Sequence, residues 1–320
     1  PQLKLAFQDL GQGITCIETH FQRPGLASCY LLQAGDQAVI IDTGTAHTVP
    51  LIMQLLEQKG IRPQQVRYVI PTHVHLDHAG GTGQLMQQFP SAELVIHPFG
   101  ARHMIDPTKL AAGATAVYGE AQFNRDYGEL VPVAEDRVLT VEDGETLDLD
   151  GRLLLCLDTP GHARHHICIW DRQSRGFFTG DTFGIAYPEL YTERGPFMLL
   201  PSTPIQFDPD AWHQSLDRLA AYQPERMYLT HYCSLETPLA HIDTLHQEID
   251  AYREIALASI DEPQRQQRIE ASLRDFYLKR LRQHGCSLDE TQIERLLGMD
   301  FGLCAQGLEV WLQKRAVKPA

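Results

Sequence analysis

The sequence predicts an α/β protein with a helical C-terminal extension. In the first 240 residues, short apolar runs typical of strands alternate with stretches whose apolar residues recur at helical spacing. Beyond about residue 242 only helical patterns remain. We therefore predict an α/β domain over residues 1–241, followed by a helical extension over residues 242–320.

Each element of the α/β part is indicated by its own local pattern. Residues 49–59 carry apolar side chains at helical spacing and end at Gly60, and a second helix ends at Pro90. A third helix begins at Asp208, a good N-cap residue followed by proline, and runs to about Tyr222. Strands are predicted over residues 15–19, 28–32, 38–42, 66–70, 93–96, 137–141, 146–149, 153–158, 167–170, 176–179 and 226–230.

The rest of the chain is predicted to be mainly helical. The segment 98–135 is irregular in pattern and partly helical. Beyond residue 242, amphipathic stripes predict helices, and Pro263, Gly285 and Gly298 are expected to separate them. The predicted helices cover residues 242–260, 264–284, 288–298 and 301–317.

Composition excludes several classes of protein. The chain has 320 residues, enough to bury a full core without disulfides. Its net charge of −14 argues against nucleic acid or an anionic membrane as the main partner. No apolar run reaches the length of a membrane helix, and the N-terminus lacks the pattern of a secretory signal. The seven scattered cysteines, without a C-x-x-C pair, predict free thiols and a cytoplasmic location.

The segment that follows the strand at residues 66–70 carries four metal-binding side chains within six residues. These are His73, His75, Asp77 and His78, in a stretch that ends in Gly80-Gly81. His73 and His75 are two apart, so an extended backbone points them to the same side. Imidazole and carboxylate together suit zinc, iron or manganese. The alternative is a solvated surface cluster, which this spacing at a strand-to-helix turn disfavours.

Three more candidate ligands follow later strands. His162, Asp181 and His231 each stand just beyond the carboxyl end of a predicted strand, where the sites of α/β proteins collect. One such residue alone is more often structural. All three, in this order after the first cluster, indicate a metal centre.

These motifs resemble those of the metallo-β-lactamase superfamily, whose signature is T-H-x-H-x-D-H followed by separated His, Asp and His. The resemblance covers roughly residues 10–240 and implies an αββα sandwich with a two-metal site at one edge. Residues 97–103 (HPFGARH) and 160–166 (PGHARHH) are similar to an uncharacterised, quorum-sensing-type subgroup.

The resemblance also implies a role for each ligand. His73, His75 and His162 would hold one metal ion, while Asp77, His78 and His231 would hold the other. Asp181 would bridge the two ions, and Asp42 would support the ligands without touching a metal. Two divalent ions, zinc first and iron or manganese as alternatives, would activate a bridging hydroxide that attacks a carbonyl or phosphoryl group. Asp77 is the predicted catalytic residue, because it would both bind metal and orient that hydroxide.

The leading functional hypothesis is a dinuclear metal-dependent hydrolase of an ester, thioester or lactone. Aromatic residues in the long loop 183–207 suggest a small acyl-bearing substrate, with ordinary loop packing as the alternative. A mononuclear iron dioxygenase acting on a glutathione persulfide is the second hypothesis, because that subgroup keeps much the same motif. A nuclease is disfavoured by the acidic charge, and a non-catalytic partner-binding member by the complete ligand set.

Two further predictions concern the extension and the remaining histidines. The helical tail is expected to pack near the substrate mouth or to form a homodimer contact, because of its amphipathic stripes. His97 and His103 are predicted to be structural, and His166 to support the third histidine ligand. No pairing is predicted for six of the remaining histidines, which are His20, His47, His213, His241, His246 and His284.

Overall fold

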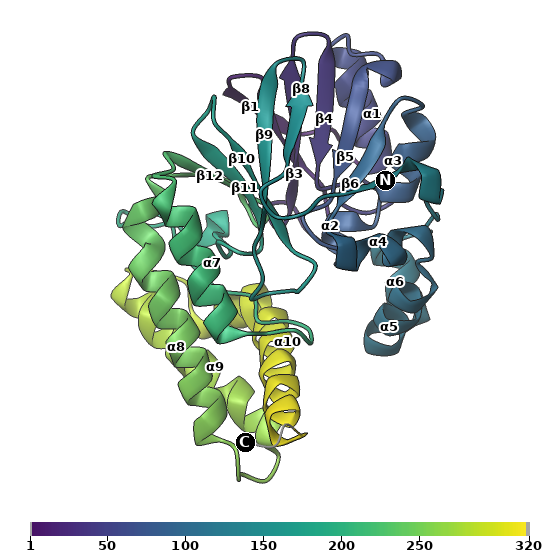
Figure 1. Cartoon of the computed structure of the whole chain (residues 1–320). Helices are drawn as coiled ribbons and strands as arrows, with labels where there is room; N and C mark the ends of the chain where they lie inside the picture. Colours follow the sequence, from purple (N-terminus) through teal and green to yellow (C-terminus); the bar gives the residue numbers. More distant parts are fainter. Residues whose placement is uncertain (1, 318–320) are drawn as a thin grey trace. The chain divides into compact units, whose positions relative to one another are not determined.

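The computed structural model describes residues 2–317, and these divide into two compact units (Figure 1). The first unit extends to Asp158 and adds His165–Gly180 and Pro224–Glu236. The remaining described residues form the second unit, which includes the C-terminal helices. The domain boundary that we place at residue 241 remains a prediction.

The first unit contains a seven-stranded sheet in chain order. Its first four strands are antiparallel, and the last three continue parallel to the fourth. The sequence patterns missed the first of these strands, whose residues are largely exposed. The strands are β1 (Phe7–Gly11), β2 (Ile14–Glu18), β3 (Ser28–Ala34), β4 (Gln37–Ile41), β5 (Val66–Ile70), β6 (Glu93–Ile96) and β7 (Val138–Thr140).

A second sheet of six strands completes the sandwich of this unit. Its order is β13-β12-β11-β10-β9-β8, and only the β11–β12 pair is parallel. The bounds are β8 (Thr146–Leu149), β9 (Arg152–Asp158), β10 (Ile167–Asp171), β11 (Gly176–Gly180), β12 (Arg226–Leu229) and β13 (Cys233–Glu236).

Both faces of the first sheet are buried along β2, β3, β4 and β5, which explains the nearly continuous apolar sequence of these strands. On β3, Tyr30 and Leu32 enter the core between the two sheets, while Cys29 and Leu31 enter the core beneath the helices. Figure 1 shows α1 and α3 along the outer face of this sheet. The helices of the unit are α1 (Val49–Gln58), α2 (Leu76–Ala79), α3 (Thr82–Gln88), α4 (Pro98–Ile105), α5 (Thr108–Tyr118) and α6 (Glu120–Asp126). The predicted α/β sandwich is confirmed.

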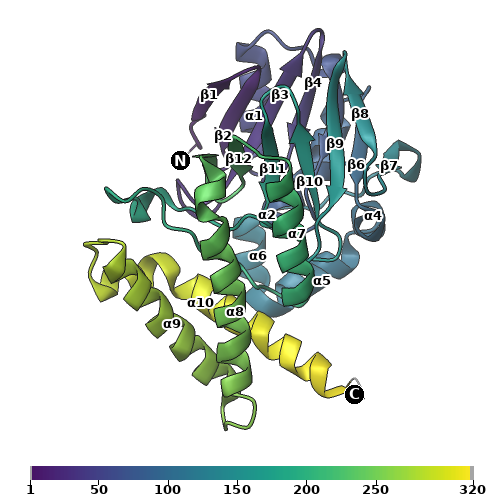
Figure 2. The same cartoon turned by 60° about the vertical axis from the view of Figure 1, so that its left-hand side comes forward.

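The second unit is mainly helical. Its long helices are α7 (Pro209–Ala221), α8 (Ile242–Ala258), α9 (Arg265–Gln283) and α10 (Glu290–Val317). Figure 2 shows α7 beside α8, as does Figure 1. None of the helices within residues 2–317 is both long and apolar enough to cross a membrane.

The predicted break at Gly298 is wrong, because α10 continues through it. A glycine inside a helix costs only about 1 kcal/mol relative to alanine. The buried stripe of α10, which includes Ile293, Leu297 and Phe301, continues across that position. Tertiary burial of this stripe therefore outweighs the local cost.

Candidate metal centre

Four of the predicted ligands lie where β5 leads into α2. Polar side chains collect at the carboxyl ends of parallel strands, and β5 is one of the parallel strands. The rings of His73 and His75 are 4.5 Å apart between centroids, and His73 lies 4.1 Å from His78. His73 and His78 are fully buried, whereas His75 and Asp77 are half-buried. The exposed sides of this cluster are therefore those of His75 and Asp77.

The first unit holds a complete triangle of donor atoms. His78 Nε2 lies 3.5 Å from Asp77 Oδ2, and His231 Nε2 lies 3.0 Å from the same oxygen. The two Nε2 atoms are 3.3 Å apart. Tetrahedral ligands with bonds of about 2.0–2.1 Å would be separated by about 3.3–3.4 Å. The three donors therefore fit a single zinc-like ion, and the residues of this triangle are a group that could hold a metal.

Asp42 fixes the orientation of this triangle from behind. Its Oδ2 accepts hydrogen bonds from His78 Nδ1 at 2.8 Å and from the Thr230 hydroxyl at 2.6 Å. Its Oδ1 accepts from the Thr72 amide at 2.7 Å. Asp42 is itself buried and follows β4 in a left-handed conformation, with φ of 57°. This carboxylate therefore connects the ends of both sheets, because Thr72 follows β5 and Thr230 follows β12.

The ring nitrogens that face away from the ligand atoms are also held. His231 Nδ1 lies 2.7 Å from the Leu26 carbonyl oxygen, to which it can only donate. The Thr72 hydroxyl donates to Asp42 at 3.2 Å and accepts from His73 Nδ1 at 3.0 Å. Each proton is thereby placed on Nδ1, and Nε2 keeps the lone pair that a metal needs.

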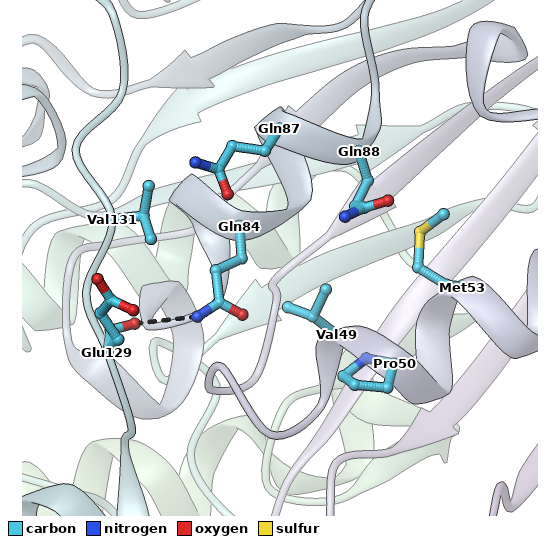
Figure 3. A pocket seen from close by; sticks show the side chains of 8 residues that line it. All are labelled: Val49, Pro50, Met53, Gln84, Gln87, Gln88, Glu129 and Val131. Atoms are coloured by element: carbon cyan, nitrogen blue, oxygen red, sulfur yellow. Dashed lines mark hydrogen bonds between the residues drawn. The ribbon is translucent and has the colours of Figure 1, made fainter.

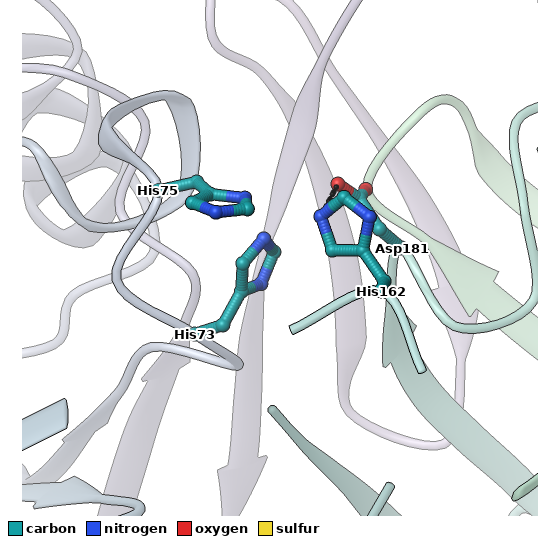
Figure 4. Close-up of side chains that lie close together, drawn as sticks. All are labelled: His73, His75, His162 and Asp181. Carbon is teal, nitrogen blue, oxygen red and sulfur yellow. Dashed lines mark ion pairs between the residues drawn. The ribbon is translucent and has the colours of Figure 1, made fainter. Parts of the chain in front are cut away.

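The second unit contributes His162 and Asp181, which lie together. His162 Nδ1 donates to the Pro201 carbonyl oxygen at 2.6 Å, and its Nε2 lies 3.1 Å from Asp181 Oδ2. Both side chains are buried. Figure 4 draws this pair with His73 and His75, and all four offer donors of the kind that hold a metal ion.

The remaining histidines of the motif have structural contacts. His97 caps α4 by accepting from the Phe99 amide at 3.0 Å, and its Nε2 lies 3.1 Å from Asp158. His165 Nδ1 accepts from the Val74 amide at 3.3 Å. His166 stacks on His73 with 4.7 Å between ring centroids. His166 therefore supports the ring of a predicted ligand.

The long loop 183–207 packs against the C-terminal helices of its own unit. The hydroxyl of Tyr187 donates to both carboxylate oxygens of Asp300 at 3.2 Å, and Phe197 is buried near Tyr277. Of the aromatic residues that suggested a substrate surface, Tyr191 is exposed. Ordinary loop packing therefore accounts for Tyr187 and Phe197.

A separate hollow lies on the first unit, away from the predicted ligands. Figure 3 shows its lining, in which the Gln84 amide donates to the Glu129 carbonyl oxygen at 3.3 Å. Its volume is about 380 Å³, and its lining combines amide and aliphatic side chains from α1, α3 and residues 129–131. This chemistry offers neither a nucleophile nor a set of metal ligands.

Sequence reasoning named Asp42 as a supporting residue but missed the other groups that orient the ligands. Thr72 and Thr230 belong to the short sequences Pro-Thr-His and Leu-Thr-His, in which a threonine precedes a ligand histidine. That repeated pairing was an available signal. The carbonyl oxygens of Leu26 and Pro201 gave no such signal in the sequence, because every residue has a backbone carbonyl group.

The fold and these donor sets define a class: a metal-binding α/β sandwich whose ligands follow the strands. A family model described as the metallo-beta-lactamase superfamily matches residues 23–231. The chain therefore belongs to the metallo-β-lactamase superfamily.

Individual relatives agree with this assignment. A metallo-beta-lactamase fold-containing protein of Sulfurisphaera tokodaii is 27% identical over 212 residues, which cover 65% of this chain and 73% of that protein. The human protein named acyl-coenzyme A thioesterase MBLAC2 is 27% identical over 189 residues, or 55% of this chain and 65% of its own length. A crystal structure of a metallo-beta-lactamase family protein from Thermus thermophilus shares the fold with a TM-score of 0.66 at 19% identity, covering 96% and 95% of the two chains. The prediction of a metal-dependent hydrolase of this superfamily is confirmed.

Proposed function

We propose that this chain is a dinuclear metal-dependent hydrolase that acts on a small acyl-bearing ester, thioester or lactone. His73, His75 and His162 hold one ion in this proposal, and Asp77, His78 and His231 hold the other. Asp181 would be a ligand of both ions in this proposal. Zinc is the metal proposed, with iron or manganese as the alternatives.

One observation carries the proposal of a second ion. The Asp77, His78 and His231 donors form a triangle with edges of 3.0–3.5 Å, which suits a metal ion. This triangle is a set of metal-binding donors additional to His73 and His75. The Asp42 carboxylate and the Leu26 carbonyl, which hold the two histidine rings, add to this support.

Bound divalent ions would supply hydroxide near neutral pH and would polarise the oxygen under attack. The chain itself positions the donors, through the Nδ1 hydrogen bonds described above. Asp77 has a side chain 23% exposed to solvent, so it can reach an incoming water molecule as well as its histidine neighbours. We assign to its carboxylate the role of orienting that water and accepting its proton.

The thioester class receives support from the human relative. The human relative is named an acyl-coenzyme A thioesterase, and the alignment with it covers 55% of this chain. The acidic net charge of −14 does not favour a nucleic acid substrate. We therefore rank acyl thioesters first, and simple esters and lactones next.

Metal counting tests the number of ions. Natively purified protein should hold two ions per chain by elemental analysis, and Asp77→Ala and His78→Ala should each lose mainly the second. Asp181→Ala should lose at least one ion and nearly all hydrolysis. A single iron that is retained in Asp77→Ala, together with oxygen consumption, would instead identify a mononuclear iron dioxygenase.

A substrate panel tests the chemistry. Acyl-coenzyme A thioesters, short esters and lactones should be compared at equal concentration, with Asp181→Ala as the inactive control. Thioester cleavage that exceeds the others supports our ranking, and no hydrolysis of any class by the two-metal protein would contradict it. We also propose a cytoplasmic location, because all seven cysteines are free. We further propose that the protein forms a homodimer, which sedimentation can test.

A further inference from the structure

Two histidines outside the candidate metal centre meet on neighbouring helices. His213 on α7 and His246 on α8 stack with 4.9 Å between ring centroids and an interplanar angle of 15°. Their Nδ1 atoms are 2.6 Å apart. Both helices belong to the second unit and run side by side (Figures 1 and 2).

Each ring is also held by a carboxylate on the opposite helix. Asp250 of α8 lies 2.9 Å from Nε2 of His213, and Asp217 of α7 lies 2.9 Å from Nε2 of His246. The arrangement is reciprocal, since each helix carries the sequence His-x-x-x-Asp and the aspartate of one contacts the histidine of the other.

These contacts determine where the lone pairs lie. An ionised carboxylate only accepts hydrogen bonds, so it places the ring proton of a neutral histidine on Nε2. The Nδ1 atoms of His213 and His246 are then both acceptors. Two nitrogen lone pairs that face each other at 2.6 Å repel unless a cation lies between them.

We propose that His213 and His246 bind a divalent transition-metal ion through their Nδ1 atoms, at a site distinct from the candidate catalytic centre. Imidazole nitrogen favours copper and zinc, and a carboxylate on the far ring nitrogen is typical of metal-binding histidines. The two rings are 23–24% exposed, so water can complete the coordination. Only a small separation of the rings is needed, since ligand nitrogens of one ion lie about 3 Å or more apart.

The surrounding structure is suited to a metal ion that joins α7 and α8. Arg253 of α8 pairs with Asp210 of α7 about one helical turn away, which holds the helices in the same antiparallel register. Trp212 and Leu216 of α7 and Ile249 of α8 are buried, so the backbones that carry the histidines are fixed. The ion would therefore join two rigid helices and would not organise a mobile loop.

Copper provides the direct test. Full-length protein carrying its catalytic metal should bind one further equivalent of Cu²⁺, and its electron paramagnetic resonance spectrum should show coupling to two nitrogens. His213→Ala and His246→Ala should each abolish that spectrum. Asp217→Asn and Asp250→Asn should weaken the binding about 10- to 100-fold. His103→Ala, at a half-buried histidine of α4, is the matched control and should change nothing.

Thermal unfolding with Zn²⁺ gives a second measurement. Excess Zn²⁺ should raise the Tm of the loaded wild-type protein by several degrees, and should not raise that of His213→Ala. The proposal is overturned if no additional ion binds, or if binding survives both histidine substitutions. It is also overturned if stability responds to pH but not to metal, because the pair would then share only a proton.

Discussion

Replacing Asp42 by asparagine tests how far the metal site depends on a residue that contacts no ion. Asp42 receives hydrogen bonds from the amide and hydroxyl of Thr72, from His78 Nδ1 and from the Thr230 hydroxyl. Three of these converge on Oδ2. Asp42→Asn keeps the shape of the side chain but leaves only one acceptor oxygen.

The expected cost follows from these contacts. If the amide nitrogen takes the place of Oδ2, it is a hydrogen-bond donor that meets two other donors, His78 Nδ1 and the Thr230 hydroxyl. If the amide is flipped, the buried Thr72 amide loses its acceptor. Either orientation costs about 1–3 kcal/mol of folding free energy for each buried group left unsatisfied. Because His78 also loses the acceptor that orients it, the affinity for the ion at Asp77, His78 and His231 should fall about 10- to 100-fold.

Competition with a chromophoric chelator measures that affinity, and urea unfolding of the metal-free protein measures the stability. Asp171→Asn is a suitable control, because Asp171 is buried and pairs with Arg152 at 2.5 Å in the same unit. That change should cost about 3–5 kcal/mol of stability and leave metal affinity unchanged. Wild-type affinity in a folded Asp42→Asn protein would refute the role assigned to Asp42.

Three further changes give separate tests. Gly180→Ala should reduce both metal affinity and stability, since φ is 50° and the added Cβ would lie 2.5 Å from Thr72 Oγ1. A chelator titration measures the affinity, and an unfolding curve measures the stability. Unchanged values would contradict the arrangement of the site described above. Gly307→Ala should destabilise by about 1–3 kcal/mol despite the higher helix propensity of alanine, because its Cβ would lie 1.9 Å from the Ser202 carbonyl oxygen; the metal content should stay at the wild-type value. Burial raises the pKa of Glu248 to about 7, against the opposing effect of Arg280. Its folded-state pKa is therefore above its unfolded value, so the stability that this carboxyl contributes below about pH 4.5 should fall as pH rises through 7. Glu248→Gln should remove that fall when Tm is measured from pH 5 to 8. An unchanged pH profile of Tm would show that Glu248 does not cause the fall.

Local sequence was sufficient for most strands and for the first ligand cluster. The predicted strand at residues 146–149 coincides with β8, and that at 66–70 with β5. The short period of a strand and the spacing of His73, His75, Asp77 and His78 are local properties, so a single sequence contains them. The narrower subgroup suggested by residues 97–103 and 160–166 remains a prediction.

What the sequence did not predict depends on contacts between distant segments. The His213–His246 pair joins residues 33 apart along the chain. The matching His-x-x-x-Asp spacings in α7 and α8 become informative only once the two helices are known to be antiparallel neighbours. The continuity of α10 through Gly298 likewise depends on burial, and no local propensity reports that.

The groups that hold the ligand rings also bear on how the protein can lose its metal site through mutation. His231 and His162 are oriented by the carbonyl oxygens of Leu26 and Pro201, which belong to the backbone. A point substitution at either position changes the side chain and leaves that acceptor in place. His78 and His73 are instead oriented by the side chains of Asp42 and Thr72. Substitutions that remove an orienting hydrogen bond of these four histidines are therefore expected at Asp42 and Thr72. The side chains at positions 26 and 201 can therefore change without loss of the hydrogen bonds that orient His231 and His162.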